Sequence, residues 1–184
     1  MSQAYIYILL TDTGTLFTRS IKKYTKAPFN HVSLSLDPEL NELYSFGRKK
    51  PNNPLNGGFV KEDVVHGTYR NYPGTTCEIY KLPVSKREVE KIKRLIAFFQ
   101  KKEKKWFYNL LGVLGVSINE PVEIDSSYFC SQFVSDVLHR SGINLWEKLP
   151  SLVTPDDFRK SAKVKKIFEG KLFEYHPIKI QMNT

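Results

Sequence analysis

The first part of the chain shows the hydrophobic patterns of short strands. Residues 4–10 (AYIYILL) are rich in aromatic and β-branched side chains, which predicts a strand. Apolar and polar residues alternate through 31–37 (HVSLSLD), the period-two pattern of a half-buried strand. Asp37-Pro38 marks a turn, and the chain returns through 42–48 (ELYSFGR). These segments predict an antiparallel hairpin.

The segments around this hairpin are less regular. A short helix is expected at 16–25 (LFTRSIKKYT), and a loop is expected at 49–58 (KKPNNPLNGG). Two further strands are predicted at 58–65 (GFVKEDVV) and 75–84 (TTCEIYKLPV). Cys77 lies inside the second of these strands and is interpreted as a packing residue.

The clearest helical pattern begins after residue 84. Ser85 and Glu88 form a capping box, and apolar residues then recur at helical spacing over 89–99. The following stretch, 106–118 (WFYNLLGVLGVSI), is strongly apolar and contains two glycines. We interpret it as a buried helix or a helix followed by a loop.

Two more elements complete the chain. The segment 126–142 (SSYFCSQFVSDVLHRSG) predicts an amphipathic helix that ends at Gly142, because glycine favours the left-handed conformation found after helices. Thr154 and Pro155 have the residue types of an N-cap and a first helical position. The stretch 171–182 (KLFEYHPIKIQM) resembles a closing strand.

No internal repeat or linker interrupts this order of strands, helices and a closing strand. It predicts one α+β domain over residues 1–184, long enough to bury a sizeable core. The net charge is +9, from 28 Lys and Arg against 19 Asp and Glu, and much of the excess lies in 86–105. The charge indicates either weak attraction to polyanions or a solvated helix face. No nucleic-acid-binding motif accompanies it, so no specific nucleic acid partner is expected.

The sequence also gives an expectation about location. It contains no transmembrane segment of membrane length, and the apolar run near the N-terminus is too short for a signal-peptide core. Ser2 stands where myristoylation requires glycine. Two cysteines argue against a disulfide framework. A cytoplasmic protein is therefore expected.

Few residue types remain that could perform chemistry. The four histidines are far apart in sequence, so neither a metal nor a cofactor is expected. The chain has no glycine-rich phosphate loop and no Gly-x-Ser-x-Gly turn. A cysteine acting with a histidine is the remaining possibility.

Cys130 has two interpretations. It shares a helix face with apolar residues such as Phe133 and Val134, and free cysteine is among the most buried residue types. However, three possible capping residues, at 125–127, place it in or just before the first helical turn. Unpaired N–H groups and the helix dipole stabilise a thiolate there, and the same N–H groups can contribute to an oxyanion hole.

His31 also has two interpretations. It shares the polar strand face with Ser33 and Ser35, where an isolated histidine is usually a surface residue. A catalytic base must instead be held on a rigid element facing the nucleophile, and a strand meets that need. Whether His31 and Cys130 meet is left open by the sequence.

Several segments together resemble a known family. A strand that starts with histidine (FNHVSLSLD), a returning strand (ELYSFGR) and a later helix that starts with cysteine (YFCSQFVSDVLHRSGI) follow the order found in circularly permuted NlpC-type papain-like cysteine hydrolases, the YiiX/YebB-like group. FYNLLGVLG and TPDDF are also similar. The resemblance covers roughly Tyr5 to Phe168. It implies a permuted papain-like fold, with an antiparallel sheet or half-barrel packed against helices.

The resemblance also implies roles for individual residues. Cys130 would be the nucleophile and His31 the general base of a cysteine hydrolase. The family's third residue is a polar group, often glutamate, on the strand after the histidine. The matching position is most nearly Ser45, which departs from the family because a hydroxyl cannot stabilise imidazolium as a carboxylate does. Glu42 is the alternative, three residues earlier and on the opposite strand face.

Three functions follow from these observations. The first is a cysteine amidase or peptidase that cleaves a peptide, amide or ester bond through Cys130. The second is an acyltransferase or thioesterase of the lecithin:retinol acyltransferase branch, acting on a lipid-like substrate. The third is a non-catalytic binding module on the same fold.

Overall fold

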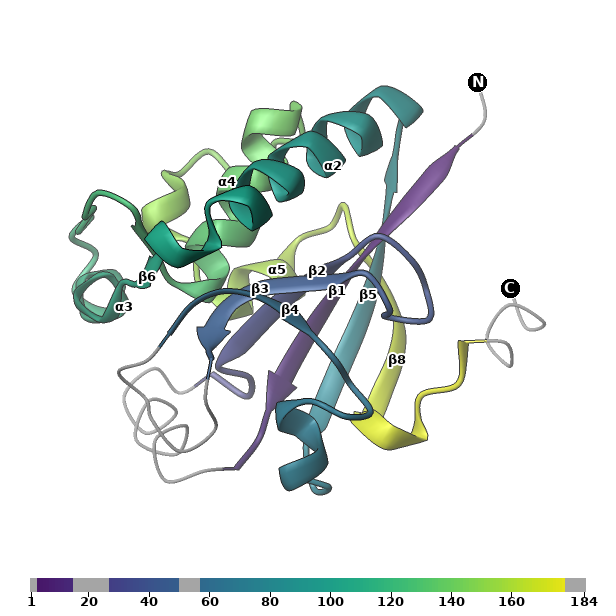
Figure 1. Cartoon of the computed structure of the whole chain (residues 1–184). Helices are drawn as coiled ribbons and strands as arrows, with labels where there is room; N and C mark the ends of the chain where they lie inside the picture. The colour runs from purple at the N-terminus through teal and green to yellow at the C-terminus, as the bar shows by residue number, and fades with distance from the viewer. Residues whose placement is uncertain (1–2, 15–26, 50–56, 178–184) are drawn as a thin grey trace.

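The computed structural model describes residues 3–14, 27–49 and 57–177. The short helix expected at 16–25 lies entirely outside the described residues. Most of the loop expected at 49–58 and the end of the expected closing strand also lie outside them. Within these ranges the protein is a mixed α+β structure with a six-stranded antiparallel sheet and four α-helices (Figure 1).

The sheet confirms the predicted hairpin and the strands around it. In spatial order its strands are β4 (Gly57–Glu62), β3 (Leu43–Arg48), β2 (His31–Ser35), β1 (Ala4–Asp12), β5 (Thr76–Val84) and β8 (Lys165–Lys171). In the pairing of β1 with β2, Thr11 lies opposite His31. This register places His31 at the end of β2, next to the segment that connects it to β1.

Helices α2 (Lys86–Lys101) and α4 (Cys130–Ser141) pack across one face of the sheet (Figure 1). The predicted capping box of α2 is present, because Ser85 and Glu88 bond to each other's backbone N–H groups. Four fully buried phenylalanines join both helices to β3 and β4: Phe46, Phe59, Phe99 and Phe133. Aromatic packing of this kind buries large apolar area and fixes the position of α4 on the sheet.

The opposite face of the sheet carries a second, smaller core. Leu9, Leu43, Cys77 and Ile79 are buried there, together with Tyr69 from the short 3-10 helix η1 (Thr68–Asn71). The interpretation of Cys77 as a packing residue agrees with its 1% exposure. Burial raises the pKa of its thiol to about 12, with a smaller contribution from a neighbouring carboxylate.

The apolar stretch 106–118 differs from its prediction. It forms a two-residue strand, β6 (Phe107–Tyr108), and helix α3 (Leu110–Ser117), but much of α3 is exposed rather than buried. β6 pairs in parallel with β7 (Ser127–Tyr128), which leads directly into α4. Tertiary packing, rather than composition, therefore decides how much of this helix is covered.

The C-terminal elements are partly as predicted. Helix α5 (Pro155–Lys160) begins after Thr154, whose side chain accepts a hydrogen bond from the Asp157 N–H. The described part of the strand expected at 171–182 does not form as predicted: β8 (Lys165–Lys171) ends where that strand should begin, and the 3-10 helix η4 (Leu172–Glu174) follows. The strand predicted at 58–65 is shorter than expected, because β4 ends at Glu62.

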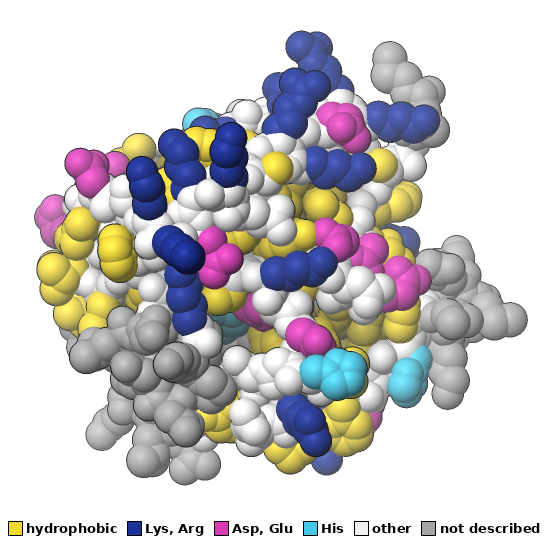
Figure 2. Space-filling model, viewed as in Figure 1, with side chains coloured by type: hydrophobic (Ala, Val, Ile, Leu, Met, Phe, Trp, Pro, Cys, Tyr) yellow, Lys and Arg dark blue, Asp and Glu magenta, His cyan; other side chains and the backbone are white. Residues whose placement is uncertain are grey.

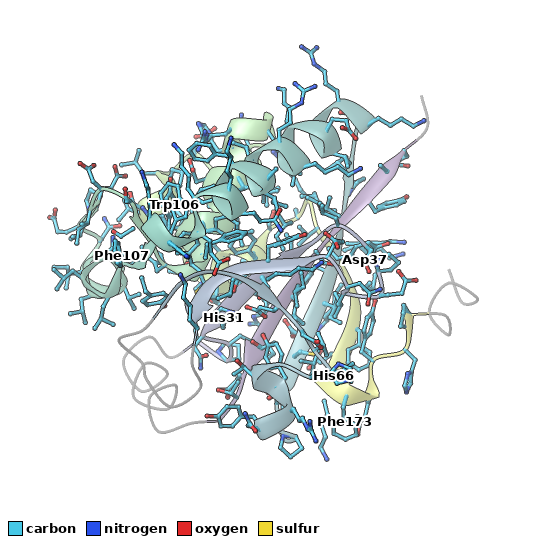
Figure 3. The ribbon with its side chains drawn as sticks, viewed as in Figure 1. His31, Asp37, His66, Trp106, Phe107 and Phe173 are labelled. Atoms are coloured by element: carbon cyan, nitrogen blue, oxygen red, sulfur yellow. The ribbon has the colours of Figure 1, made fainter. Side chains whose placement is uncertain are left out.

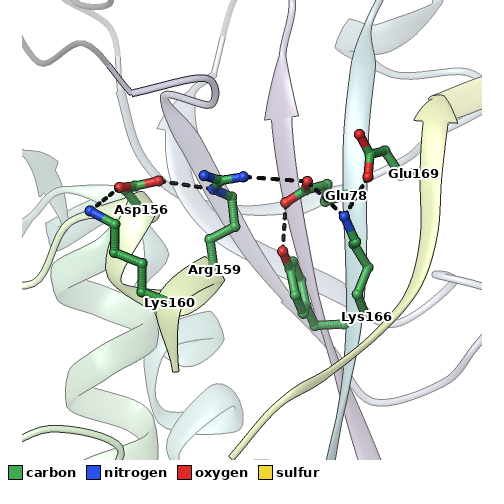
Figure 4. A network of polar contacts seen from close by, with 7 residues as sticks. Glu78, Asp156, Arg159, Lys160, Lys166 and Glu169 are labelled. Carbon is green, nitrogen blue, oxygen red and sulfur yellow. Dashed lines mark hydrogen bonds and ion pairs between the residues drawn. The ribbon is translucent and has the colours of Figure 1, made fainter. Parts of the chain in front are cut away.

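A buried carboxylate on β5 connects this strand to α5 and to the edge strand β8 (Figure 4). Glu78 on β5 is 2% exposed and accepts a hydrogen bond from the Tyr80 hydroxyl at 2.5 Å. Its Oε1 lies 3.2 Å from Lys166 Nζ on β8 and 3.7 Å from Arg159 Nη1 on α5. Such a charge is tolerated in the interior because it is paired and hydrogen-bonded.

No helix in the described ranges combines the length and apolar character needed to cross a membrane.

Candidate active site

Cys130 is the first residue of α4 and is 4% exposed. The capping prediction was wrong in detail, since Ser127 belongs to β7 and the N-cap residue is Phe129. The Phe129 N–H donates to Gln132 Oε1 at 3.4 Å, within the first helical turn. The helix start expected for Cys130 is therefore present, although its caps are different residues. The thiol also belongs to the larger apolar core, so an inward face and a helix N-terminus coincide at this residue.

His31 reaches Cys130 from the sheet. The Cys130 sulfur lies 4.0 Å from the carbonyl oxygen of Asn30, the residue that precedes His31. The Cys130 thiol and the His31 imidazole lie close enough that each shifts the pKa of the other. The imidazole is 22% exposed and lies at the end of β2, on the side of the sheet away from α2 (Figure 3). The structure thus brings together two residues that are about a hundred positions apart in sequence.

The group that holds the imidazole is Glu62, which the sequence reasoning did not identify. His31 Nε2 lies 2.7 Å from Glu62 Oε1, and the glutamate side chain is 10% exposed. Ser45, the expected third residue, donates its hydroxyl hydrogen bond to Glu62 Oε1. Glu42, the alternative, accepts from Tyr44 and from Lys61. Neither expected residue is the carboxylate partner of the imidazole.

The strand register explains this arrangement. β2 pairs with β3 through Ser35 and Leu43, and the same register places Ser45 beside Ser33 rather than beside His31. Gly47 then lies next to the imidazole, where an added Cβ would be 3.5 Å from His31 Cε1. Glu62 lies opposite Leu43 in the pairing of β3 with β4, and its carboxylate contacts Ser45 on β3 and Ser33 on β2 as well as His31.

Glu62 is surrounded by hydrogen-bond donors besides His31. Ser33 Oγ donates to Oε1 at 3.0 Å, and the Tyr69 hydroxyl donates to Oε2 at 2.8 Å. Tyr69 is 8% exposed, and its hydroxyl also lies 3.3 Å from Thr11 Oγ1. These donors fix the direction of the carboxylate and stabilise its charged form.

The electrostatic environment favours a charged cysteine–histidine pair. Burial by itself would lower the pKa of His31, but the charge of Glu62 and the hydrogen bond to Cys130 outweigh it and raise that pKa to about 10. Burial would raise the pKa of the Cys130 thiol, yet the hydrogen bond and charge of His31 lower it overall, helped by the backbone N–H groups of Val32 and Ser131. The pKa of Glu62 is also lowered, because the effects of His31, Ser45 and Tyr69 exceed the effect of burial. All three shifts act toward the charged forms of these groups.

Other histidines lie outside this site. His66 Nδ1 is 3.3 Å from Asp63 Oδ2 near the surface. His139 lies in the last turn of α4, and its Nδ1 is 2.8 Å from Asn144 Oδ1. In the parts of the chain that the structure describes, no three His, Cys, Asp or Glu side chains form a group that could hold a metal ion.

A scan against protein-family models finds no match for the chain, and a search of curated proteins finds none either. The interpretation of the site therefore depends on its geometry.

Proposed function

We propose that this protein is a cysteine hydrolase of the permuted papain-like type, which cleaves an amide or ester bond through Cys130. The observation that supports this most strongly is the row of Cys130, His31 and Glu62, with the cysteine at a helix start and the imidazole between thiol and carboxylate. A nucleophile, a base and a group that orients the base are the three parts needed for acyl transfer. The order of His31 before Cys130 in the chain matches the permuted family that the sequence resembles.

In the proposed reaction the Cys130 thiolate attacks the acyl carbonyl and forms a carbon–sulfur bond. Because Nε2 of His31 faces Glu62, Nδ1 is the nitrogen left to exchange protons with the thiol and the substrate. The imidazolium gives its proton to the leaving amine or alcohol as the bond to the carbonyl carbon breaks, which leaves a thioester on Cys130. The neutral imidazole then takes a proton from water, and the hydroxyl attacks the thioester. The products are a carboxylic acid and the restored thiolate–imidazolium pair.

Glu62 orients the imidazole and stabilises its charged form in this proposal. Ser45 has a supporting role, because its hydroxyl donates a hydrogen bond to Glu62. Glu62, rather than Ser45, then orients the imidazole. A carboxylate as the third residue stabilises imidazolium by its charge as well as by hydrogen bonding, whereas a serine hydroxyl would supply only a hydrogen bond.

The experiment is acylation by an activated ester such as p-nitrophenyl acetate, followed by mass spectrometry of the intact protein and its peptides. We expect one acetyl group on Cys130 and continued release of p-nitrophenol as the thioester hydrolyses. Cys130→Ala should abolish both signals, and Cys77→Ala, the matched control, should keep them because Cys77 lies in the opposite core. If Cys130 is never acylated while Cys130→Ala only lowers stability, the protein is a non-catalytic module and the proposal is wrong.

A further inference from the structure

Helix α3 and the strand before it leave several large apolar side chains in solvent. We refer to five of them as the apolar surface: Phe107 (63% exposed), Leu110 (40%), Leu111 (58%), Leu114 (59%) and Ile118 (64%). The leucines and Ile118 follow helical spacing along one side of LLGVLGVS and its C-terminal end. A helix with apolar residues on all sides is normally buried, and a contiguous exposed group of this kind usually marks a binding surface.

The inner side of α3 is closely packed, so its outward side chains are held in place. A Cβ added at Gly112 would lie 2.9 Å from Phe129 Cδ1, and one at Gly115 would lie 2.5 Å from the Glu120 carbonyl oxygen. Asn109 caps the helix by accepting the Gly112 N–H at 2.7 Å. The two glycines therefore let the helix approach the protein closely while the leucines point away from it.

A strongly basic segment adjoins the apolar surface. Residues 86–105, which form α2 and the turn after it, contain nine Lys and Arg and three Glu, which gives +6 of the chain's net +9. Figure 2 shows dark-blue side chains along α2 and yellow side chains at the end where α3 lies. Phe98 on this helix is 40% exposed, and Lys102 Nζ lies 4.4 Å from its ring centroid. Exposed aromatic and basic groups thus continue directly into the apolar surface.

The charge distribution selects among possible occupants. A second copy of the chain would bring two basic segments toward each other, which opposes association. A phospholipid surface with anionic headgroups satisfies both features, since apolar side chains enter the boundary between headgroups and acyl chains while lysines contact the phosphates. Acidic residues do follow α3, at 120, 123 and 125, so the attraction comes from the α2 side.

We propose that the apolar surface and the basic face of α2 together dock the protein onto an anionic lipid surface, with α3 lying in the interface. The arrangement also bears on the candidate active site. The Asn109 N–H donates to the Tyr128 carbonyl oxygen at 2.9 Å, and Cys130 is two residues further along the chain. Docking through α3 therefore brings the start of α4 close to the lipid. The docking itself does not depend on catalysis.

The test is co-sedimentation with vesicles of phosphatidylcholine alone and of phosphatidylcholine with phosphatidylserine. We expect binding to the second kind of vesicle that weakens as salt is raised. Leu111→Gln with Leu114→Gln should reduce partitioning by about tenfold or more, because two exposed leucines no longer transfer from water. Phe173→Gln is the matched control, since Phe173 is 60% exposed at the opposite end of the molecule from Phe107 (Figure 3) and its loss should change nothing.

Several outcomes would overturn the proposal. Vesicle binding that is absent, or unchanged in the double leucine variant, would contradict it. A concentration-dependent mass that the same variant abolishes would assign the surface to a second copy of the chain. Retention on immobilised polyglutamate without vesicle binding would assign it to an acidic protein. Cys130→Ala should bind vesicles as the unaltered protein does, so failure of docking and failure of the hydrolase proposal are separate results.

Discussion

Glu62→Gln tests whether the charge of Glu62, rather than the shape of its side chain, stabilises the charged His31 imidazole. In the unaltered protein His31 Nε2 lies 2.7 Å from Glu62 Oε1. Glutamine keeps an oxygen that can accept a hydrogen bond from Nε2, but its side chain carries no charge. The charge of Glu62 is the main cause that raises the pKa of His31 to about 10 from 6.5. Without it, burial acts against the imidazolium, so the pKa of His31 should fall.

The size of the fall follows from the geometry. Two unit charges about 4 Å apart interact by about 4 kcal/mol at an effective dielectric constant of about 20. One pKa unit corresponds to about 1.4 kcal/mol, so removing this interaction should lower the pKa of His31 by about 2 to 3 units. The imidazolium is then lost at a lower pH, and the alkaline limit of Cys130 reactivity moves down with it.

Nuclear magnetic resonance titration of the histidine side chains measures this shift directly. The chain has four histidines, so His31 can be assigned by comparison with His31→Ala, and the other three report on the control. Glu42→Gln is the matched variant, because Glu42 pairs with Lys61 rather than with the imidazole. A His31 that titrates near 6.5 in the unaltered protein, or an unchanged pKa in Glu62→Gln, would show that the charge of Glu62 does not stabilise the imidazolium.

Three further substitutions test the surroundings of the site and the fold. Ser45→Ala removes one hydrogen-bond donor to Glu62, so the pKa of that carboxyl should rise. The pKa of His31 should fall by less than it does in Glu62→Gln. An equal fall in both variants would contradict a supporting role for Ser45. Tyr69→Phe removes the hydroxyl that donates to Glu62 Oε2 at 2.8 Å. The free energy of unfolding in urea should fall by about 1 to 2 kcal/mol while Cys130 stays reactive. Complete loss of Cys130 reactivity would show that Tyr69 does more than stabilise the fold. Glu78→Gln weakens the pairing with Lys166 and should lower unfolding free energy by about 1 to 3 kcal/mol without changing the His31 titration, and no change in stability would show that the network contributes little.

The features that could be predicted from sequence depend on local patterns. The strand at His31 follows from period-two alternation, and the helix at Cys130 from apolar spacing that ends at Gly142. Each lies within one element, so neighbouring residues determine it. The meeting of the two residues is different, because it depends on how α4 packs on the sheet.

Glu62 could not be found in the same way. Its position depends on the register of two successive strand pairs, β2 with β3 and β3 with β4, and a shift of one residue would turn it to the other face. The signal available in sequence was a glutamate within the expected strand GFVKEDVV, three residues before its end. The exposure of α3 was missed for a related reason, because apolar composition predicts burial only when another element covers the helix.

If His31 activates Cys130, the two cysteines should differ sharply in their alkylation rates. Iodoacetamide should be applied to the folded protein at about pH 6.5, well below the ordinary thiol pKa of about 8.5. We expect rapid labelling of Cys130, no labelling of Cys77, and loss of the rapid labelling in His31→Ala. Equal, slow labelling of both cysteines that requires denaturation would contradict this expectation.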